Sequence, residues 1–311
     1  MVENCDIAKH YQTKGLDSFE QLTCREWSAS ARQHREQLSA TLDPWLENRS
    51  RGGKDPVFDF LFEYYAFRPS ALKTWSPGWG KVLQIEDEPL PDIPELVCRN
   101  GIAYLDPEQF PRQRLSSARW ILRLLRKSRE HKPSFGCFGM HEWAMVYKTE
   151  QVRHQQIPLR MSPKEIEQFV DSRPLVCTHF DAYRFLTDPA RPKNRHRLSR
   201  KRFPEFEQAG CLHTNMDLYK WAFKFHPWIS GDLLRKAFFL ALEARVIDMK
   251  ASPYDLRERG LKPIRIETPE GRETYLDRQK EIYRKSIPVR DRLIGQYERL
   301  CSDSGPIRWG D

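Results

Sequence analysis

The sequence predicts a mainly α-helical protein, a single globular helical domain with a small β-hairpin insertion. Apolar residues recur at helical spacing over most of the chain, most clearly over 230–250. Between about 80 and 111 the pattern changes to the β-like pieces KVLQIE and GIAYLD, separated by an acidic, proline-rich stretch. No internal repeat or low-complexity linker divides the chain, so one α-rich domain is expected over 1–311, with 1–50 as an N-terminal helical extension within it.

The helices follow from local patterns. Phe19, Leu22, Trp27, Leu38 and Trp45 have loosely helical spacing, which predicts a first helix over 16–48. The segment VFDFLFEYYAF is apolar on several sides and is typical of a buried helix. A last helical pattern contains one proline, which is expected to divide it. The remaining predicted helices cover 115–130, 138–148, 162–172, 215–226, 230–250, 269–285 and 289–300, the last two on either side of Pro288.

The composition indicates a folded protein of a reducing compartment. Hydrophobic residues make up 39% and charged residues 31%, and 9 Trp with 17 Phe argue against a disordered chain. The seven cysteines are an odd number without a CxxC pair, and no signal-like segment opens the chain, so a cytoplasmic location is expected. No apolar stretch reaches the roughly 18 residues that span a bilayer. A membrane partner is therefore not expected, and no obligate protein partner is evident.

The positive charge is concentrated. The net charge is +9, and the run RPKNRHRLSRKR holds seven basic residues and no acid. Such a run attracts phosphates through counterion release, although basic loops are also common as plain solvated surface. The predicted nucleic-acid contacts are Arg191, Lys193, Arg195, Arg197, Arg200, Lys201 and Arg202.

Three segments between Cys137 and Lys220 share one arrangement of residues. GCFGMHEW, CTHFDAYRF and GCLHTNMDLYKW each carry a cysteine, a histidine and a nearby carboxylate. Histidine and carboxylate side chains perform acid–base chemistry and also bind zinc or iron. The segments therefore predict a site, with Glu142, Asp181, His141 and His179 as catalytic candidates.

The other residues of the predicted site have assigned roles. The cofactor itself is unknown, and a divalent metal such as zinc or iron is one possibility, held by His179, His213 and Asp217. The predicted substrate contacts are Trp143, Tyr183, Arg184, Asn215, Tyr219 and Lys220.

Other interpretations of these segments stay open. The cysteines can be small buried hydrophobes and the histidines satisfied core residues. Cys137 or Cys211, beside a helix start, can also serve as a nucleophile. The sequence has no GxSxG, P-loop or GxGxxG motif, which argues against common serine hydrolases, NTPases and dinucleotide enzymes.

Several long motifs resemble those of a bacterial family commonly labelled 3-methyladenine DNA glycosylase. The likeness covers about residues 57–297 and rests on DFLFEYYAFRPSALKTWSPGWG, FGCFGMHEWAMVY, THFDAYRFLTDPARPKN, GCLHTNMDLYKWAFK and RVIDMKASPYDL. The resemblance implies a DNA base-repair enzyme that hydrolyses the N-glycosidic bond of an alkylated purine, with DNA as its partner. The basic stretch RHRLSRKR continues beyond the family-like ARPKN.

Two alternatives accompany this expectation. One is a metal-dependent enzyme that uses the same histidines and carboxylates on a small, polar, anionic substrate. The other is a non-catalytic nucleic-acid-binding protein that relies on residues 191–202. A glycosylase needs a base pocket and a carboxylate, a metalloenzyme needs converging donors, and a binding protein needs only the basic surface.

Overall fold

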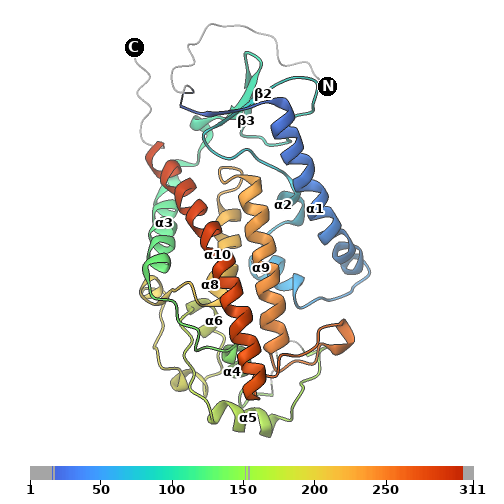
Figure 1. The fold of residues 1–311 in the computed structure, drawn as a ribbon, viewed down its shortest axis with the longest axis vertical. Helices are drawn as coiled ribbons and strands as arrows, with labels where there is room; N and C mark the ends of the chain where they lie inside the picture. The colour runs from blue at the N-terminus through green and yellow to red at the C-terminus, as the bar shows by residue number, and fades with distance from the viewer. Residues whose placement is uncertain (1–15, 17, 151, 153–154, 304–311) are drawn as a thin grey trace.

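A computed structural model describes residue 16 and residues 18–150, 152 and 155–303. The predicted mainly helical fold is confirmed (Figure 1). The long helices α1 (Cys24–Ser50), α3 (Leu115–Glu130), α9 (Gly231–Ala251) and α10 (Pro269–Asp303) run roughly along the long axis, with α8 (Leu212–Lys224) among them. The single-domain organisation stays a prediction.

The centre of the fold is the pair of helices α8 and α9. Helix α9 packs most extensively against α8 and then against α10. Its sequence is apolar nearly all round, and small residues such as Ala237, Ala241 and Ala244 are fully buried and permit close helix packing. The same helix buries Arg235, Arg245 and Asp248, so these charges need partners inside the protein.

The first helix begins later than predicted. Thr23 and Glu26 form a capping box, in which the Glu26 amide donates to Thr23 Oγ1 and the Thr23 amide donates to Glu26 Oε2 at 2.9 Å. Residues Glu20–Leu22 instead form strand β1, so the expected helical start at residue 16 was wrong. Helix α1 then packs against α9 and against α2 (Pro69–Lys73).

The expected hairpin is part of a small sheet. Strands β3 (Leu96–Arg99) and β4 (Ile102–Leu105) are antiparallel and joined at Asn100 and Gly101, both with the positive φ that a tight hairpin turn needs. Strand β2 (Lys81–Gln84) pairs antiparallel with β4 and parallel with β1, giving the order β1-β2-β4-β3. The sheet lies at one end of the molecule (Figure 1).

Two helical predictions need correction. The helix predicted within residues 57–67 is confined to 58–64, and most of it is the π-helical turn η1 (Phe60–Tyr64) instead of a regular α-helix. The prediction over 138–148 shrinks to α4 (Met140–Ala144), because Phe138 and Gly139 have φ values of 48° and 73°, which a helix cannot contain.

The last helix is continuous, so the expected division at Pro288 was wrong. Proline removes one backbone hydrogen bond from a helix interior. Helix α10 packs against α3, α8 and α9 and buries Ile282 and Val289 on either side of the proline. This packing maintains the helix despite the missing bond.

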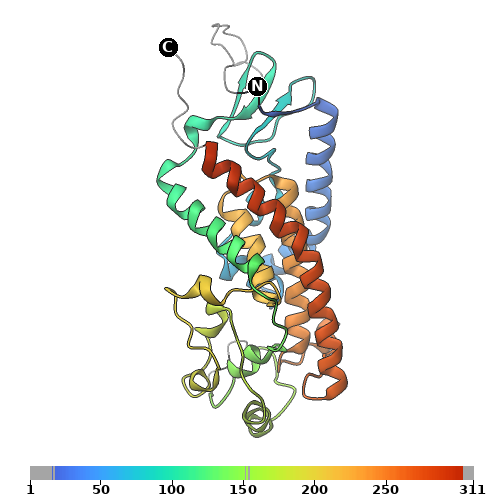
Figure 2. The same cartoon turned by 60° about the vertical axis from the view of Figure 1, so that its left-hand side comes forward.

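The described residues between α3 and α8 form short elements at the end of the molecule opposite the sheet (Figure 2). No helix among the described residues is both long and apolar enough to cross a membrane. The described chain also contains the short helices α5 (Pro163–Asp171), α6 (Phe180–Tyr183) and α7 (Phe203–Phe206). Its 3₁₀ turns are η2 (Pro107–Gln109), η3 (Arg112–Arg114), η4 (Arg191–Lys193) and η5 (Arg257–Arg259).

Candidate functional site

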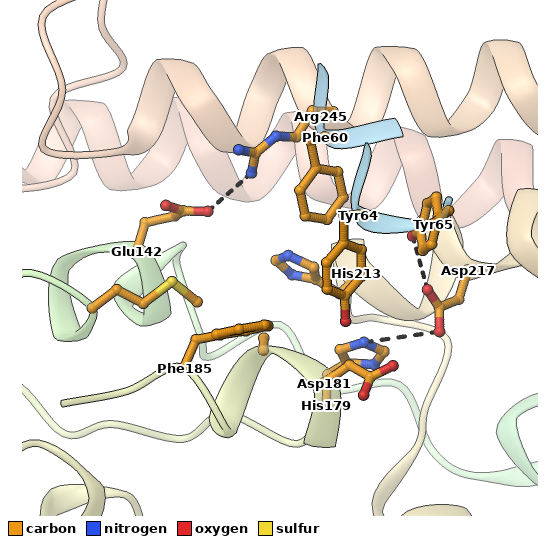
Figure 3. Close-up of a pocket in the computed structure, with 12 residues that line it drawn as sticks. Phe60, Tyr64, Tyr65, Glu142, His179, Asp181, Phe185, His213, Asp217 and Arg245 are labelled. Atoms are coloured by element: carbon orange, nitrogen blue, oxygen red, sulfur yellow. Dashed lines mark hydrogen bonds and ion pairs between the residues drawn. The ribbon is translucent and has the colours of Figure 1, made fainter. Parts of the chain in front are cut away.

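A pocket lies where η1, α4, α6, α8 and α9 meet (Figure 3), and its empty volume is about 410 Å³ when the open solvent at its mouth is included. Half of the lining residues have aromatic or aliphatic side chains, and the other half are acidic residues, histidines and an arginine. The lining residues are Phe60, Tyr64, Tyr65, Met145, Ala182 and Phe185, together with Glu142, His179, Asp181, His213, Asp217 and Arg245.

One side of the pocket is formed by what we call the Arg245 group, which consists of His141, Glu142, Arg245 and Asp248. Arg245 Nη1 lies 2.9 Å from Glu142 Oε1 and 2.7 Å from Asp248 Oδ2. Asp248 Oδ1 lies 3.0 Å from His141 Nε2. All four side chains are buried, and the Arg245 guanidinium also lies 4.3 Å from the centre of the Phe60 ring. This group is a closed network of alternating charges.

The electrostatics of the Arg245 group favour the charged forms. Burial by itself lowers the pKa of His141, but its ion pair with Asp248 raises that pKa well above the usual value. Burial likewise raises the pKa of Asp248, and His141 and Arg245 outweigh it and bring that pKa below its usual value. The group therefore contains two cations and two carboxylates that compensate one another.

The other side is formed by what we call the Lys220 group, which consists of His179, Asp181, Asp217 and Lys220. Lys220 Nζ lies 2.8 Å from Asp181 Oδ2 and 3.0 Å from Asp217 Oδ2. The Tyr65 hydroxyl donates to Asp217 Oδ1 at 2.8 Å, and His179 Nε2 lies 3.9 Å from Asp217 Oδ2. Lys220 does not line the pocket itself but holds both carboxylates that do.

Glu207 orients the histidine of the Lys220 group from outside the pocket. His179 Nδ1 lies 2.9 Å from Glu207 Oε1, and the Thr214 hydroxyl donates to Glu207 Oε2 at 2.5 Å. Burial lowers the pKa of His179, but Glu207 raises it above the usual value. Burial raises the pKa of Asp181, and Lys220 outweighs this effect and lowers it.

His213 lies between the two groups (Figure 3). Its ring centre is 4.4 Å from that of His141 and 5.4 Å from that of His179. Within the described part of the chain no hydrogen bond reaches its ring, and its ion-pair distance to Asp248 Oδ2 is 3.8 Å. Burial, followed by the positive charges of His141 and His179, keeps its pKa well below the usual value. This lowered pKa favours the uncharged form of His213 on the pocket wall.

The metal donors predicted from the sequence are divided between the two sides. Among the described residues, donor atoms converge within 4.8 Å in two groups, His141–Glu142–His213–Asp248 and His179–Asp181–Asp217. His213 thus does not join His179 and Asp217 in one set, which corrects that grouping. The first set already holds Arg245 and the second holds Lys220, and a divalent ion would be repelled by either cation at these distances. The arrangement fits internal charge compensation better than a metal centre.

The predicted catalytic residues meet at this site. Glu142, His179 and Asp181 line the pocket, and His141 lies behind its wall against Asp248. Among the predicted substrate contacts, Arg184 is at the rim, where Nη2 donates to the Tyr64 hydroxyl at 3.2 Å.

Five other predicted substrate contacts do not line the pocket, and Lys220, described above, is one of them. Trp143 is fully buried and donates to the Ala251 carbonyl. Asn215 accepts from the buried Arg290, Tyr219 is buried in the hydrophobic core, and the partly buried Tyr183 packs against that core. These side chains therefore support the site from behind.

Sequence reasoning missed Arg245, Asp248 and Glu207. A signal existed for the first two, since RVID places an arginine and an aspartate one turn apart inside an otherwise apolar helix. Charges in such a helix are expected to pair with each other or with a site.

The basic segment 191–202 lies at the edge of the site and contributes no lining residue. Arg191, Lys193 and Arg202 pair with the local acids Asp188, Asp171 and Glu205. Arg191 Nη2 also donates to the Arg184 carbonyl at 3.1 Å, which connects the segment to the pocket rim. The remaining four side chains are exposed, and no ion pair joins them to a described acid; they are Arg195, Arg197, Arg200 and Lys201.

No family model matches the chain, and no curated protein or solved structure matches it either. The functional conclusion therefore rests on the chemistry of the pocket.

Proposed function

We propose that the protein is an acid–base hydrolase that cleaves the N-glycosidic bond of an alkylated purine in DNA. The observation that carries this proposal is the uncharged His213, which is free of hydrogen bonds to described residues and stands beside Glu142 on the wall of a pocket with aromatic sides. A neutral imidazole in this position is a general base for a water molecule.

Glu142 and His213 are spaced for one shared water. A carboxylate oxygen of Glu142 and a nitrogen of His213 lie within 4.8 Å of each other. One water molecule can bridge two such atoms with hydrogen bonds of ordinary length. In the proposed reaction His213 removes a proton from this water, and Glu142, held by Arg245, orients it.

The walls of the pocket suit a flat, positively charged ring. Phe60 and Tyr64 are stacked with ring centres 4.8 Å apart, and Phe185 lies edge-on to Tyr64 at 5.9 Å. Aromatic faces attract cations. A purine alkylated on a ring nitrogen carries positive charge while it is still attached to the sugar.

The same positive charge simplifies the chemistry. A cationic base is a good leaving group and needs no proton from the enzyme, so the site has to supply only a base for water and negative charge near the sugar. We assign the second role to Asp181, which lines the pocket and whose lowered pKa keeps it ionised. The basic residues at the rim, Arg184 and Arg191, are suited to contact phosphates beside the extruded nucleotide.

The test is base release from methylated duplex DNA, followed by chromatography of the free base, with a known glycosylase run alongside. We expect the wild-type protein to release base and the variants His213→Gln and Glu142→Gln to lose about 10²- to 10⁴-fold in rate. The matched control is Glu243→Gln, an exposed change on the same helix as Arg245, and it is expected to keep full activity.

Folding is checked separately, because Glu142→Gln also breaks an ion pair with the buried Arg245. His213→Gln removes no hydrogen bond to a described residue, so this variant reports on chemistry with the least structural change. Absence of base release by the folded wild-type protein, or full activity of folded His213→Gln, would contradict the proposal.

A further inference from the structure

Three cysteine-bearing loops meet behind the pocket, and one glutamine joins them. Gln208 Oε1 accepts from the Ser134 amide at 2.8 Å and from the Gly210 amide at 2.7 Å. Its Nε2 donates to Thr178 Oγ1 at 3.3 Å. These bonds hold together the loops that carry Cys137, Cys177 and Cys211. The first two loops are in close contact, because a Cβ added at Gly136 would lie 3.5 Å from the Val176 side chain.

Cys137 is the first member of a thiol–imidazole–carboxylate chain. Its Sγ lies 3.5 Å from His141 Nδ1, and His141 Nε2 lies 3.0 Å from Asp248 Oδ1. A cationic imidazole next to a thiol favours the thiolate, and a buried carboxylate on the far ring nitrogen keeps the imidazole charged. None of the reaction steps assigned to the pocket uses Cys137, which does not line it.

The two neighbouring thiols are chemically different. The interaction with the Cys177 thiol lowers the pKa of Cys137 well below its usual value, against the opposing effect of burial, and His141 lowers it further. The same interaction, together with burial, raises the pKa of Cys177 well above its usual value. The geometry agrees, because Cys137 Sγ faces the His141 imidazole whereas the Cys177 thiol donates to the His179 carbonyl at 3.5 Å. Cys137 is therefore the better placed nucleophile, and Cys177 is its protonated partner.

Cys137 is the least buried of the three clustered cysteines. Cys137 is only half-buried and follows the exposed Gly136, whereas Cys177 and Cys211 are buried. A small oxidant can therefore meet Cys137 first, as expected for an attacking thiolate with a resolving cysteine behind it.

We propose that Cys137 and Cys177 form an oxidation-sensitive dithiol that reacts with small hydroperoxides. The Cys137 thiolate attacks one peroxide oxygen, an S–O bond forms, the O–O bond breaks, and the leaving oxygen takes a proton to become an alcohol or water. The Cys177 sulfur then attacks the Cys137 sulfur, the S–O bond breaks, and water leaves with the Cys177 proton. Two thiols are oxidised to one disulfide, and the peroxide is reduced by the same two electrons.

Oxidation would also alter the Arg245 group. The disulfide removes the thiolate that faces His141 Nδ1, while His141, Asp248, Arg245 and Glu142 form one continuous chain to the pocket. The dithiol itself depends only on the cysteine cluster and not on the reaction proposed for the pocket.

The test treats the reduced full-length protein with equimolar hydrogen peroxide and maps the disulfides by peptide mass spectrometry. We expect a Cys137–Cys177 disulfide in the wild type and in the matched control Cys211→Ser. In Cys177→Ser, Cys137 should stop at the sulfenic acid, which dimedone traps. In Cys137→Ser, Cys177 should not react. We also expect Cys137 to be oxidised about tenfold or more faster than the exposed Cys98 at neutral pH.

Two results obtained on the wild type alone would overturn the proposal, so it does not depend on every variant folding. One is a disulfide between any other pair of cysteines in place of Cys137–Cys177. The other is oxidation of Cys137 no faster than that of Cys98.

Discussion

The two sides of the pocket are built alike but differ in depth. Each holds a cation between two carboxylates and adds a histidine, yet the Arg245 and Asp248 side chains are 2% and 0% exposed while those of Lys220 and Asp181 are 19% and 21% exposed. Charges without access to water must stay paired, whereas partly hydrated charges can exchange partners at lower cost. The Arg245 group is therefore a fixed electrostatic framework, and the Lys220 group is the side at which a ligand can compete for contacts.

Replacement of Arg245 is expected to have the largest effect. Arg245→Met leaves Glu142 and Asp248 buried without their shared cation, so the free energy of unfolding should fall by about 3–5 kcal/mol. Urea-induced unfolding followed by circular dichroism measures this change. The matched control is Arg257→Met, which removes an exposed arginine paired with Asp255 and should leave the unfolding midpoint nearly unchanged. Equal effects of the two substitutions would contradict the buried framework.

Replacement of Lys220 is expected to be milder. Lys220→Met should lower the free energy of unfolding by about 1–3 kcal/mol, because water reaches Asp181 and the Tyr65 hydroxyl still donates to Asp217. The same unfolding experiment tests it, with Lys285→Met as an exposed control on α10. A decrease larger than that of Arg245→Met would reverse the proposed order of the two sides.

How far the sequence predicts this protein depends on the range of the contacts. Helix α3 occupies its predicted residues 115–130, because the helical spacing of its own apolar residues determines where it forms. The start of α1 and the continuity of α10 depend instead on strand pairing and helix packing with distant segments. These long-range contacts have no local sequence signal.

The candidate site shows the same limit. His141, Glu142, His179 and Asp181 were predictable because histidine and carboxylate are close together in each segment. Their partners were not, because Arg245 is 103 residues from Glu142 and Asp248 is 107 residues from His141. The aromatic residues Trp143 and Tyr219 were assigned to the substrate because sequence cannot distinguish a packed ring from one that faces a pocket.

The two sides of the pocket should lose their histidine contributions to stability at different pH values. Both His141 and His179 have pKa values raised above that of an unfolded histidine, the former more strongly. Their contribution to stability is then complete below about pH 6.5 and is lost as the pH rises through each folded value. Unfolding measured from neutral to alkaline pH should show stability decreasing, with the His179 contribution lost first. In His179→Gln the earlier part of that decrease should disappear; if it persists unchanged, the assignment is wrong.

The exposed basic residues lie outside both groups and should affect binding alone. Neutralising Arg195, Arg197, Arg200 and Lys201 with glutamine should leave the unfolding midpoint unchanged, because no ion pair joins them to a described acid. If these residues bind phosphates, the slope of log affinity against log salt for duplex DNA falls by roughly 0.9 for each phosphate that is no longer neutralised. A salt titration by fluorescence anisotropy measures it. If the slope and the affinity are both unaltered, these four residues do not contribute to DNA binding.

The central claim is that an uncharged His213 stands between two internally compensated groups. The direct test is a titration of the ¹⁵N-labelled histidine rings followed by NMR. At about pH 6, where a free histidine is mostly protonated, His213 should remain neutral while His141 and His179 are charged. Protonation of His213 near the ordinary histidine pKa, together with neutral His141 and His179, would contradict the proposed site.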